Sequence, residues 1–166
     1  QKTILNTPLH SQPQQGFDYL FRVLLYSHDS VGVGHLRRNL AIASEIAATF
    51  PNSNILIVTG SPCATRFKLP ANTDLIKIPS ITKNKAGEYV TRSFSGSLEK
   101  TVKFRSNMIL ESYRLFEPAL IIMDHQLTGL NGEALDMLRE AKQKGVLTIY
   151  GLRDIKDSPE VVKRCW

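Results

Sequence analysis

The chain has 166 residues, of which 42% are hydrophobic and 22% are charged, as expected for one globular domain with its own core. No apolar run approaches the roughly 18–20 residues that cross a bilayer, and we expect no signal peptide. The formal net charge of +6 favours anionic partners, but no dense basic cluster with interleaved aromatic residues indicates nucleic acid.

Residues 1–20 are rich in glutamine, and we predict a disordered tail there. The apolar run that follows predicts a first strand at about 21–27, and a helical pattern predicts a first helix at about 35–49. Its apolar residues recur at helical spacing and predict one buried stripe, made of Leu36, Leu40, Ala43, Ala47 and Phe50.

A second strand is predicted at 54–59, because the run is β-branched and apolar throughout, as in parallel strands covered on both faces. A short helix near 63–68 and a third strand at 74–78 follow. The stretch 79–96 is long, polar and mildly basic. Such a stretch is either a functional loop or a solvated excursion that contains a small hairpin.

The pattern over 97–117 predicts a long helix that ends before Pro118. A fourth strand is predicted at 119–123. The residues expected on the buried face of the helix are Leu98, Val102, Ile109, Tyr113 and Phe116.

Asn131 is the predicted N-cap of a helix at about 132–144, and Gly145 is its expected C′ residue. A fifth strand is predicted at 146–150, and a last helix is predicted to begin near Ser158. Strands that alternate with helices predict an α/β fold in which residues 21–166 form a Rossmann-like parallel sheet with helices on both faces.

Ligands of such sheets bind beyond the carboxyl ends of the strands, so polar residues just past those ends are the site candidates. The segments concerned are 27–35, 59–61, 79–82, 124–126 and 151–154.

Within these segments, His35 lies at or next to a helix start, which disfavours a protonated imidazole and suits a general base. Asp124 ends a buried strand and could either orient a histidine or cap a loop. His28 is closer to its strand end, where it would orient the loop. Arg37 and Arg38 either face a bound phosphate or extend into water.

The pair Gly32 and Gly34 gives a G-x-G, but the third position of a dinucleotide fingerprint is Arg37. The acidic residue expected after the second strand is also replaced, by Thr59-Gly60. The pattern is therefore weak evidence for NAD, and it also fits a tight turn that needs glycine.

With these residues in hand, the chain resembles the N-terminal domain of predicted bacterial GT-B glycosyltransferases that are distantly like the peptidoglycan N-acetylglucosaminyltransferase. The resemblance covers about residues 21–157. It is carried by YSHDSVGVGHLRRNLAIA, ILIVTGSP, IKIPSITKNKAGEYVTRS and YGLRDI.

The resemblance implies an acceptor-side domain, a nucleotide-sugar donor bound mainly by a second domain, and catalysis between the two without an obligatory metal. His35 matches the family's base, and Asp124 matches its supporting aspartate. The implied substrate-binding residues are His28, Gly32, Gly34, Arg37, Ser61 and Arg153.

A GT-B enzyme needs a second domain of similar size, so we expect this chain to be a part of one that does not turn over substrate alone. Cys63 and Cys165 have no metal-ligand spacing and suggest no disulfide framework, so we predict a cytoplasmic location. In keeping with the resemblance, we expect no metal and no cofactor. Peripheral contact with the inner face of the membrane stays open. The expected partners are a nucleotide-sugar donor and a hydroxyl acceptor, not nucleic acid.

Two other classes are kept open. Residues 120–145 look like the phospho-acceptor region of response-regulator receiver domains, with Asp124 as acceptor. Against this, the first strand is followed by one acid only, Asp29, and no lysine-proline follows the fifth strand. The third class is a non-catalytic ligand-binding module.

Overall fold

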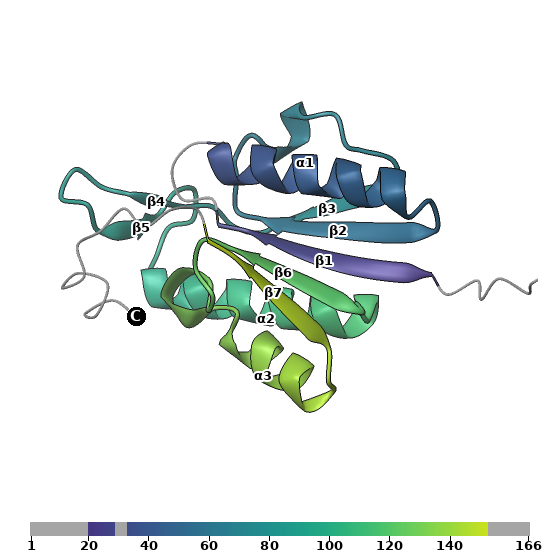
Figure 1. Ribbon diagram of the computed structural model, residues 1–166. Helices are drawn as coiled ribbons and strands as arrows, with labels where there is room; N and C mark the ends of the chain where they lie inside the picture. The colour runs from purple at the N-terminus through teal and green to yellow at the C-terminus, as the bar shows by residue number, and fades with distance from the viewer. Residues whose placement is uncertain (1–19, 29–32, 153–166) are drawn as a thin grey trace, which may run out of the picture.

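A computed structural model describes residues 20–28 and 33–152 of the chain (Figure 1). Its centre is a five-stranded sheet in the order β3-β2-β1-β6-β7, in which all neighbouring strands run parallel. The predicted Rossmann-like α/β class is thereby confirmed. The strands of this sheet are β1 (Phe21–Ser27), β2 (Ser53–Thr59), β3 (Thr73–Lys77), β6 (Leu120–Asp124) and β7 (Leu147–Gly151).

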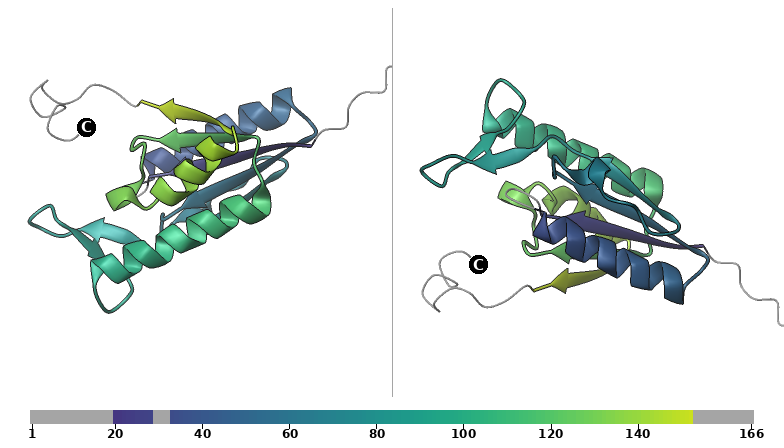
Figure 2. Two further views of the ribbon diagram at one scale, coloured as in Figure 1. Left: turned by 90° about the horizontal axis from the view of Figure 1, so that it is seen from below. Right: turned by 90° about the horizontal axis from the view of Figure 1, so that it is seen from above.

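Helices cover both faces of the sheet, as predicted. Helix α1 (Gly34–Thr49) lies on one face, and α2 (Leu98–Phe116) and α3 (Leu135–Gln143) lie on the other (Figure 1). The two views of Figure 2 show the same division, with α2 and α3 in front of the sheet from below and α1 in front from above. None of the described helices is long and apolar enough to span a membrane.

Strand β1 shows why its sequence is apolar without interruption. Val23 and Leu25 pack in the core on the side of α1, whereas Leu24 and Tyr26 pack in the core on the side of α2 and α3. All four side chains are at most 1% exposed. A parallel strand between two helical layers needs apolar residues on both faces, and this need produces the continuous run.

The polar stretch 79–96 contains a small antiparallel hairpin, β4 (Ile81–Lys83) paired with β5 (Tyr89–Thr91). The small hairpin that we considered for this stretch is therefore confirmed. The predicted short helix near 63–68 is a single 3₁₀ turn, η1 (Ala64–Arg66), and a second such turn, η2 (Leu130–Gly132), precedes α3.

Two local predictions were wrong. Asn131 does not cap α3; it lies inside η2 with φ 49°, and α3 begins only at Leu135 without a side-chain cap. The left-handed backbone at Asn131 and Gly132 cannot continue into an α-helix. Phe50 is not part of the buried stripe of α1. It lies just after the end of the helix, where it is 50% exposed and packs edge-on against Phe21.

Several predictions lie outside the described residues: the tail at 1–19, the helix from Ser158, and the site candidates Gly32 and Arg153. Gly145 follows α3 with φ 69°, as expected of a C′ glycine.

The order of the sheet reverses between β1 and β6, since the chain proceeds from β1 toward β3 on one side and reaches β7 on the other. The carboxyl ends of β1 and β6 therefore meet at the switch point where such sheets bind ligands.

Candidate active site

The two residues predicted as a catalytic pair lie together at the switch point. Asp124 is the last residue of β6, and His35 is the second residue of α1, which begins shortly after β1. The His35 Nδ1 atom lies 2.8 Å from Asp124 Oδ2. The His35 side chain is 13% exposed and that of Asp124 is 4% exposed. The carboxylate is thus buried behind an imidazole that reaches the surface.

Asp124 has two further partners, both on α1. The Asn39 side-chain amide donates to Asp124 Oδ2 at 3.2 Å and to the His35 carbonyl at 2.9 Å. Arg38 forms an ion pair with Asp124 Oδ1. Asn39 was not predicted as a site residue, and Arg38 was expected only to face a bound phosphate or to extend into water. The signal for Asn39 in the sequence was its position four residues after His35, which puts both on the same face of the helix.

These contacts fix which nitrogen of His35 is available. An ionised carboxylate only accepts hydrogen bonds, so Nδ1 of His35 carries the proton that it donates to Asp124. Nε2 of a neutral imidazole is then the acceptor.

Three histidine rings meet at this edge of the sheet. The ring centroids of His35 and His125 are 5.1 Å apart, those of His28 and His125 are 5.5 Å apart, and those of His28 and His35 are 5.8 Å apart. We call these three residues the histidine cluster. Within the described ranges, no group of three or more His, Cys, Asp or Glu side chains is arranged to hold a metal ion.

His28 is the buried member of the histidine cluster, since it is only 3% exposed. Burial, which is the largest cause, and the nearby His125, His35, Arg105 and Lys83 together lower its pKa from 6.5 to about 3. Its Nδ1 atom has no hydrogen-bond partner among the described residues. The imidazole is therefore neutral in the folded protein, in agreement with a residue that supports the site without carrying charge.

This low pKa gives a testable dependence of stability on pH. The folded-state pKa of about 3 lies below the unfolded value of 6.5, so the unfolded chain binds the extra proton between those limits. Stability then falls as pH drops through this window, by about 2 kcal/mol from His28 alone between pH 7.5 and pH 5. Urea unfolding of the wild type and His28→Asn at both pH values should show a smaller loss in the variant. Equal losses would contradict the assignment.

His125 was not predicted to be a site residue. Its backbone has φ 67°, which is uncommon for a residue other than glycine and occurs at functional sites. The end of β7 holds it, since its N–H donates to the Gly151 carbonyl at 3.2 Å and its carbonyl accepts from the Tyr150 hydroxyl. The only sequence signal was its position directly after Asp124.

The remaining candidates contact the site less directly. Arg37 is exposed on the first turn of α1. Ser61 is fully buried, and its hydroxyl accepts from the Cys63 N–H at 3.4 Å, which gives it a structural contact. Gly34 does not serve a tight turn, because it lies within α1 and a Cβ atom there would meet open space.

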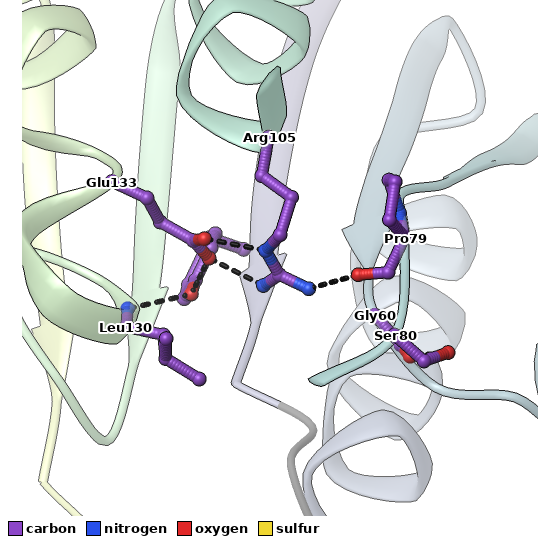
Figure 3. A network of polar contacts seen from close by, with 7 residues as sticks. Gly60, Pro79, Ser80, Arg105, Leu130 and Glu133 are labelled. Carbon is purple, nitrogen blue, oxygen red and sulfur yellow. Dashed lines mark hydrogen bonds and ion pairs between the residues drawn. The ribbon is translucent and has the colours of Figure 1, made fainter. Parts of the chain in front are cut away.

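A second buried polar network is centred on Arg105 (Figure 3). Arg105 of α2 donates to both carboxylate oxygens of Glu133 at 2.5 Å, and it also donates to the Pro79 carbonyl. The Tyr26 hydroxyl donates to Glu133 at 2.6 Å and accepts from the Leu130 N–H at 3.1 Å. The buried Arg105–Glu133 pair thus joins α2 to the residue after η2, to β1 through Tyr26 and to the residues before β4 through Pro79.

Gly129 is the glycine at which an added side chain would crowd this network. It has φ 72°, and a Cβ atom would lie 3.1 Å from both the Tyr26 hydroxyl and Glu133 Cγ. Gly87 in the hairpin turn has φ 82° but open space around it. Both Gly→Ala variants incur the left-handed strain of about 1–2 kcal/mol. We expect Gly129→Ala to lose more stability than Gly87→Ala in chemical denaturation; equal losses would show that the contacts around Gly129 relax.

No protein-family model matches the sequence, and a search of curated proteins finds no match. Among solved structures, a UGT transferase from Siraitia grosvenorii in complex with UDP is similar to this chain, with a TM-score of 0.46 and 14% sequence identity. The similarity covers 78% of this chain and 27% of that chain, so this chain spans little more than a quarter of its length. At this identity, the comparison concerns the fold alone.

Proposed function

We propose that this chain is the acceptor-side domain of a GT-B glycosyltransferase, which transfers a sugar from a nucleotide-sugar donor to an acceptor hydroxyl. The observation that carries the proposal is the contact of 2.8 Å between His35 Nδ1 and Asp124 Oδ2 at the carboxyl ends of the strands. It orients a neutral imidazole whose other nitrogen can accept a proton.

In the proposed reaction, Nε2 of His35 takes the proton of the acceptor hydroxyl as its oxygen attacks the anomeric carbon of the donor. The new C–O bond forms while the bond from the anomeric carbon to the diphosphate breaks. The nucleoside diphosphate leaves with the electron pair. Asp124 holds the Nδ1–H and thereby stabilises the imidazolium that results, as in the histidine–aspartate pairs of hydrolases.

The division of labour follows the family resemblance. The donor's nucleotide would bind mainly to a second domain, and this domain would present the acceptor to the shared cleft. His28, Gly32, Gly34, Arg37, Ser61 and Arg153 remain the proposed substrate-binding residues. Gly32 and Arg153 lie outside the described residues.

The contacts of Asp124 favour this proposal over a phosphorylated receiver domain. A phospho-acceptor aspartate offers a carboxylate oxygen to the incoming phosphoryl group. Here Oδ2 accepts from His35 and Asn39, and Oδ1 pairs with Arg38. Phosphorylation would have to break this ion pair or both hydrogen bonds. Treatment with acetyl phosphate is therefore expected to leave Asp124 unlabelled.

A binding titration tests the proposed division between donor and acceptor domains. The 166-residue chain is titrated by calorimetry against a panel of nucleotide sugars and free nucleotides. If the chain is the acceptor side, no member of the panel should bind tightly. Clear binding of one nucleotide sugar would place the donor site in this domain and overturn the acceptor-side assignment.

A further inference from the structure

The β4–β5 hairpin is fastened at its base to the carboxyl edge of the main sheet. The Ser80 hydroxyl donates to the Gly60 carbonyl, directly after β2, at 2.7 Å. Ser80 also accepts from the Arg92 N–H through its carbonyl at 3.1 Å, which closes the base of the hairpin. Figure 1 shows the hairpin beyond the edge where α1 and α2 begin.

The strongest attachment comes from Arg105. Figure 3 shows its guanidinium between Glu133 on one side and Pro79 on the other. Glu133 holds two of its nitrogens, and the third donates to the Pro79 carbonyl, next to Ser80. Arg105 is only 2% exposed, so this bond to the hairpin base is shielded from water. The planar fork of arginine suits three fixed acceptors, which a lysine cannot reproduce.

The hairpin also carries a net positive charge. It holds three basic side chains, Lys83, Lys85 and Arg92, and one acidic side chain, Glu88, which is bonded to Asn84 at 3.0 Å. Lys83 lies over the Tyr89 ring, 5.1 Å from its centroid. Lys83 and Arg105 are both among the cations that lower the pKa of His28. The geometry agrees, because Thr59 pairs in register with Ser27, so that Gly60, which accepts from Ser80, and His28 follow paired residues of neighbouring strands. The base of the hairpin is therefore fastened next to the strand end that carries His28.

We propose that the β4–β5 hairpin is the acceptor-side wall of the histidine cluster and that Arg105 is the positioning residue that holds this wall in place. The identity of the wall as acceptor-side rests on the proposed function. The stretch 79–96 then acquires a role, because its base is fastened next to the strand end that carries His28 and it holds basic and aromatic side chains at this edge of the sheet. Arg105 itself stays buried and acts through Pro79 and Glu133.

Hydrogen exchange on the 166-residue chain tests the attachment. In Arg105→Lys, the amides of residues 81–92 should exchange about tenfold faster, since the variant loses a charge-assisted hydrogen bond to the hairpin base. Amides in β1 and β6 should keep their protection. Arg114→Lys is the matched control, because Arg114 also lies on α2 and also pairs with two glutamates, Glu111 and Glu140, but is exposed.

Acylation by diethyl pyrocarbonate tests the wall. If the hairpin shields the histidine cluster, His28 should react several-fold faster in Arg105→Lys than in the wild type or Arg114→Lys. Unchanged exchange and acylation in a folded Arg105→Lys would overturn the proposal. Should Arg105→Lys not fold, Ser80→Ala must loosen the hairpin in the same way, and its failure to do so is equally decisive.

Neither measurement requires turnover. A loosened hairpin with faster acylation, in a protein that transfers no sugar, would support the attachment and refute only the proposed function.

Discussion

Replacing His35 by Gln, in a protein that joins this domain to the proposed donor domain, is expected to lower kcat by about 10²–10⁴-fold, the usual contribution of a general base. Glutamine fills similar space but offers no nitrogen that can take a proton from the acceptor hydroxyl. The measurement is nucleoside diphosphate release with saturating donor and acceptor. Because His35 would act in the chemical step, kcat should fall more than KM changes.

Arg37→Gln is the matched control for this loss. Arg37 lies on the same turn of α1 but is exposed, and a change there should affect KM at most. Asp124→Asn should lower kcat as well, since an amide can donate to Nδ1 and leave the proton on Nε2. A His35→Gln variant that transfers sugar at the wild-type rate would refute the role of His35 and favour a non-catalytic binding module.

The central pair was predictable because both residues follow buried strands. The apolar runs of β1 and β6 are unambiguous, and the parallel arrangement brings their carboxyl ends together. His35 and Asp124 were therefore expected at one edge before any contact was known. Their hydrogen bond depends in addition on the rotation of α1, which places His35 and Asn39 on its inner side.

His125 and Arg38 could not be predicted in the same way. The position of His125 depends on a left-handed backbone and on two hydrogen bonds from the end of β7, which is distant in sequence. Arg38 and Arg37 are neighbours at the start of one helix, and sequence alone did not decide which of them turns inward. The structure shows that Arg38 reaches Asp124.

The buried pair Arg105–Glu133 gave no sequence signal either. A charged residue in an amphipathic helix is normally solvated, and Arg105 is one of several basic residues on α2. It is buried because Glu133, 28 positions away and directly after η2, pairs with it. Such a pair becomes visible only when the two segments are placed in space.

Glu133→Gln is expected to give the largest loss of stability in the chain, about 3–5 kcal/mol, because it leaves the Arg105 guanidinium buried without its counter-charge. Glu133 is fully buried on its side chain, and it accepts from both Arg105 and Tyr26. Urea unfolding followed by circular dichroism measures the loss. Glu140→Gln is the matched control and should cost far less, because its partners Arg114 and Lys144 are exposed to water.

The double variant Arg105→Met/Glu133→Leu separates the charge from the space it occupies. Apolar side chains of similar volume can replace a buried ion pair at little cost, whereas removal of one partner leaves the other charge uncompensated. We therefore expect the double variant to be more stable than Glu133→Gln, with a residual loss from the Pro79 carbonyl and the Tyr26 hydroxyl. If instead it is the less stable of the two, the ion pair itself stabilises the fold beyond the packing that apolar residues can supply.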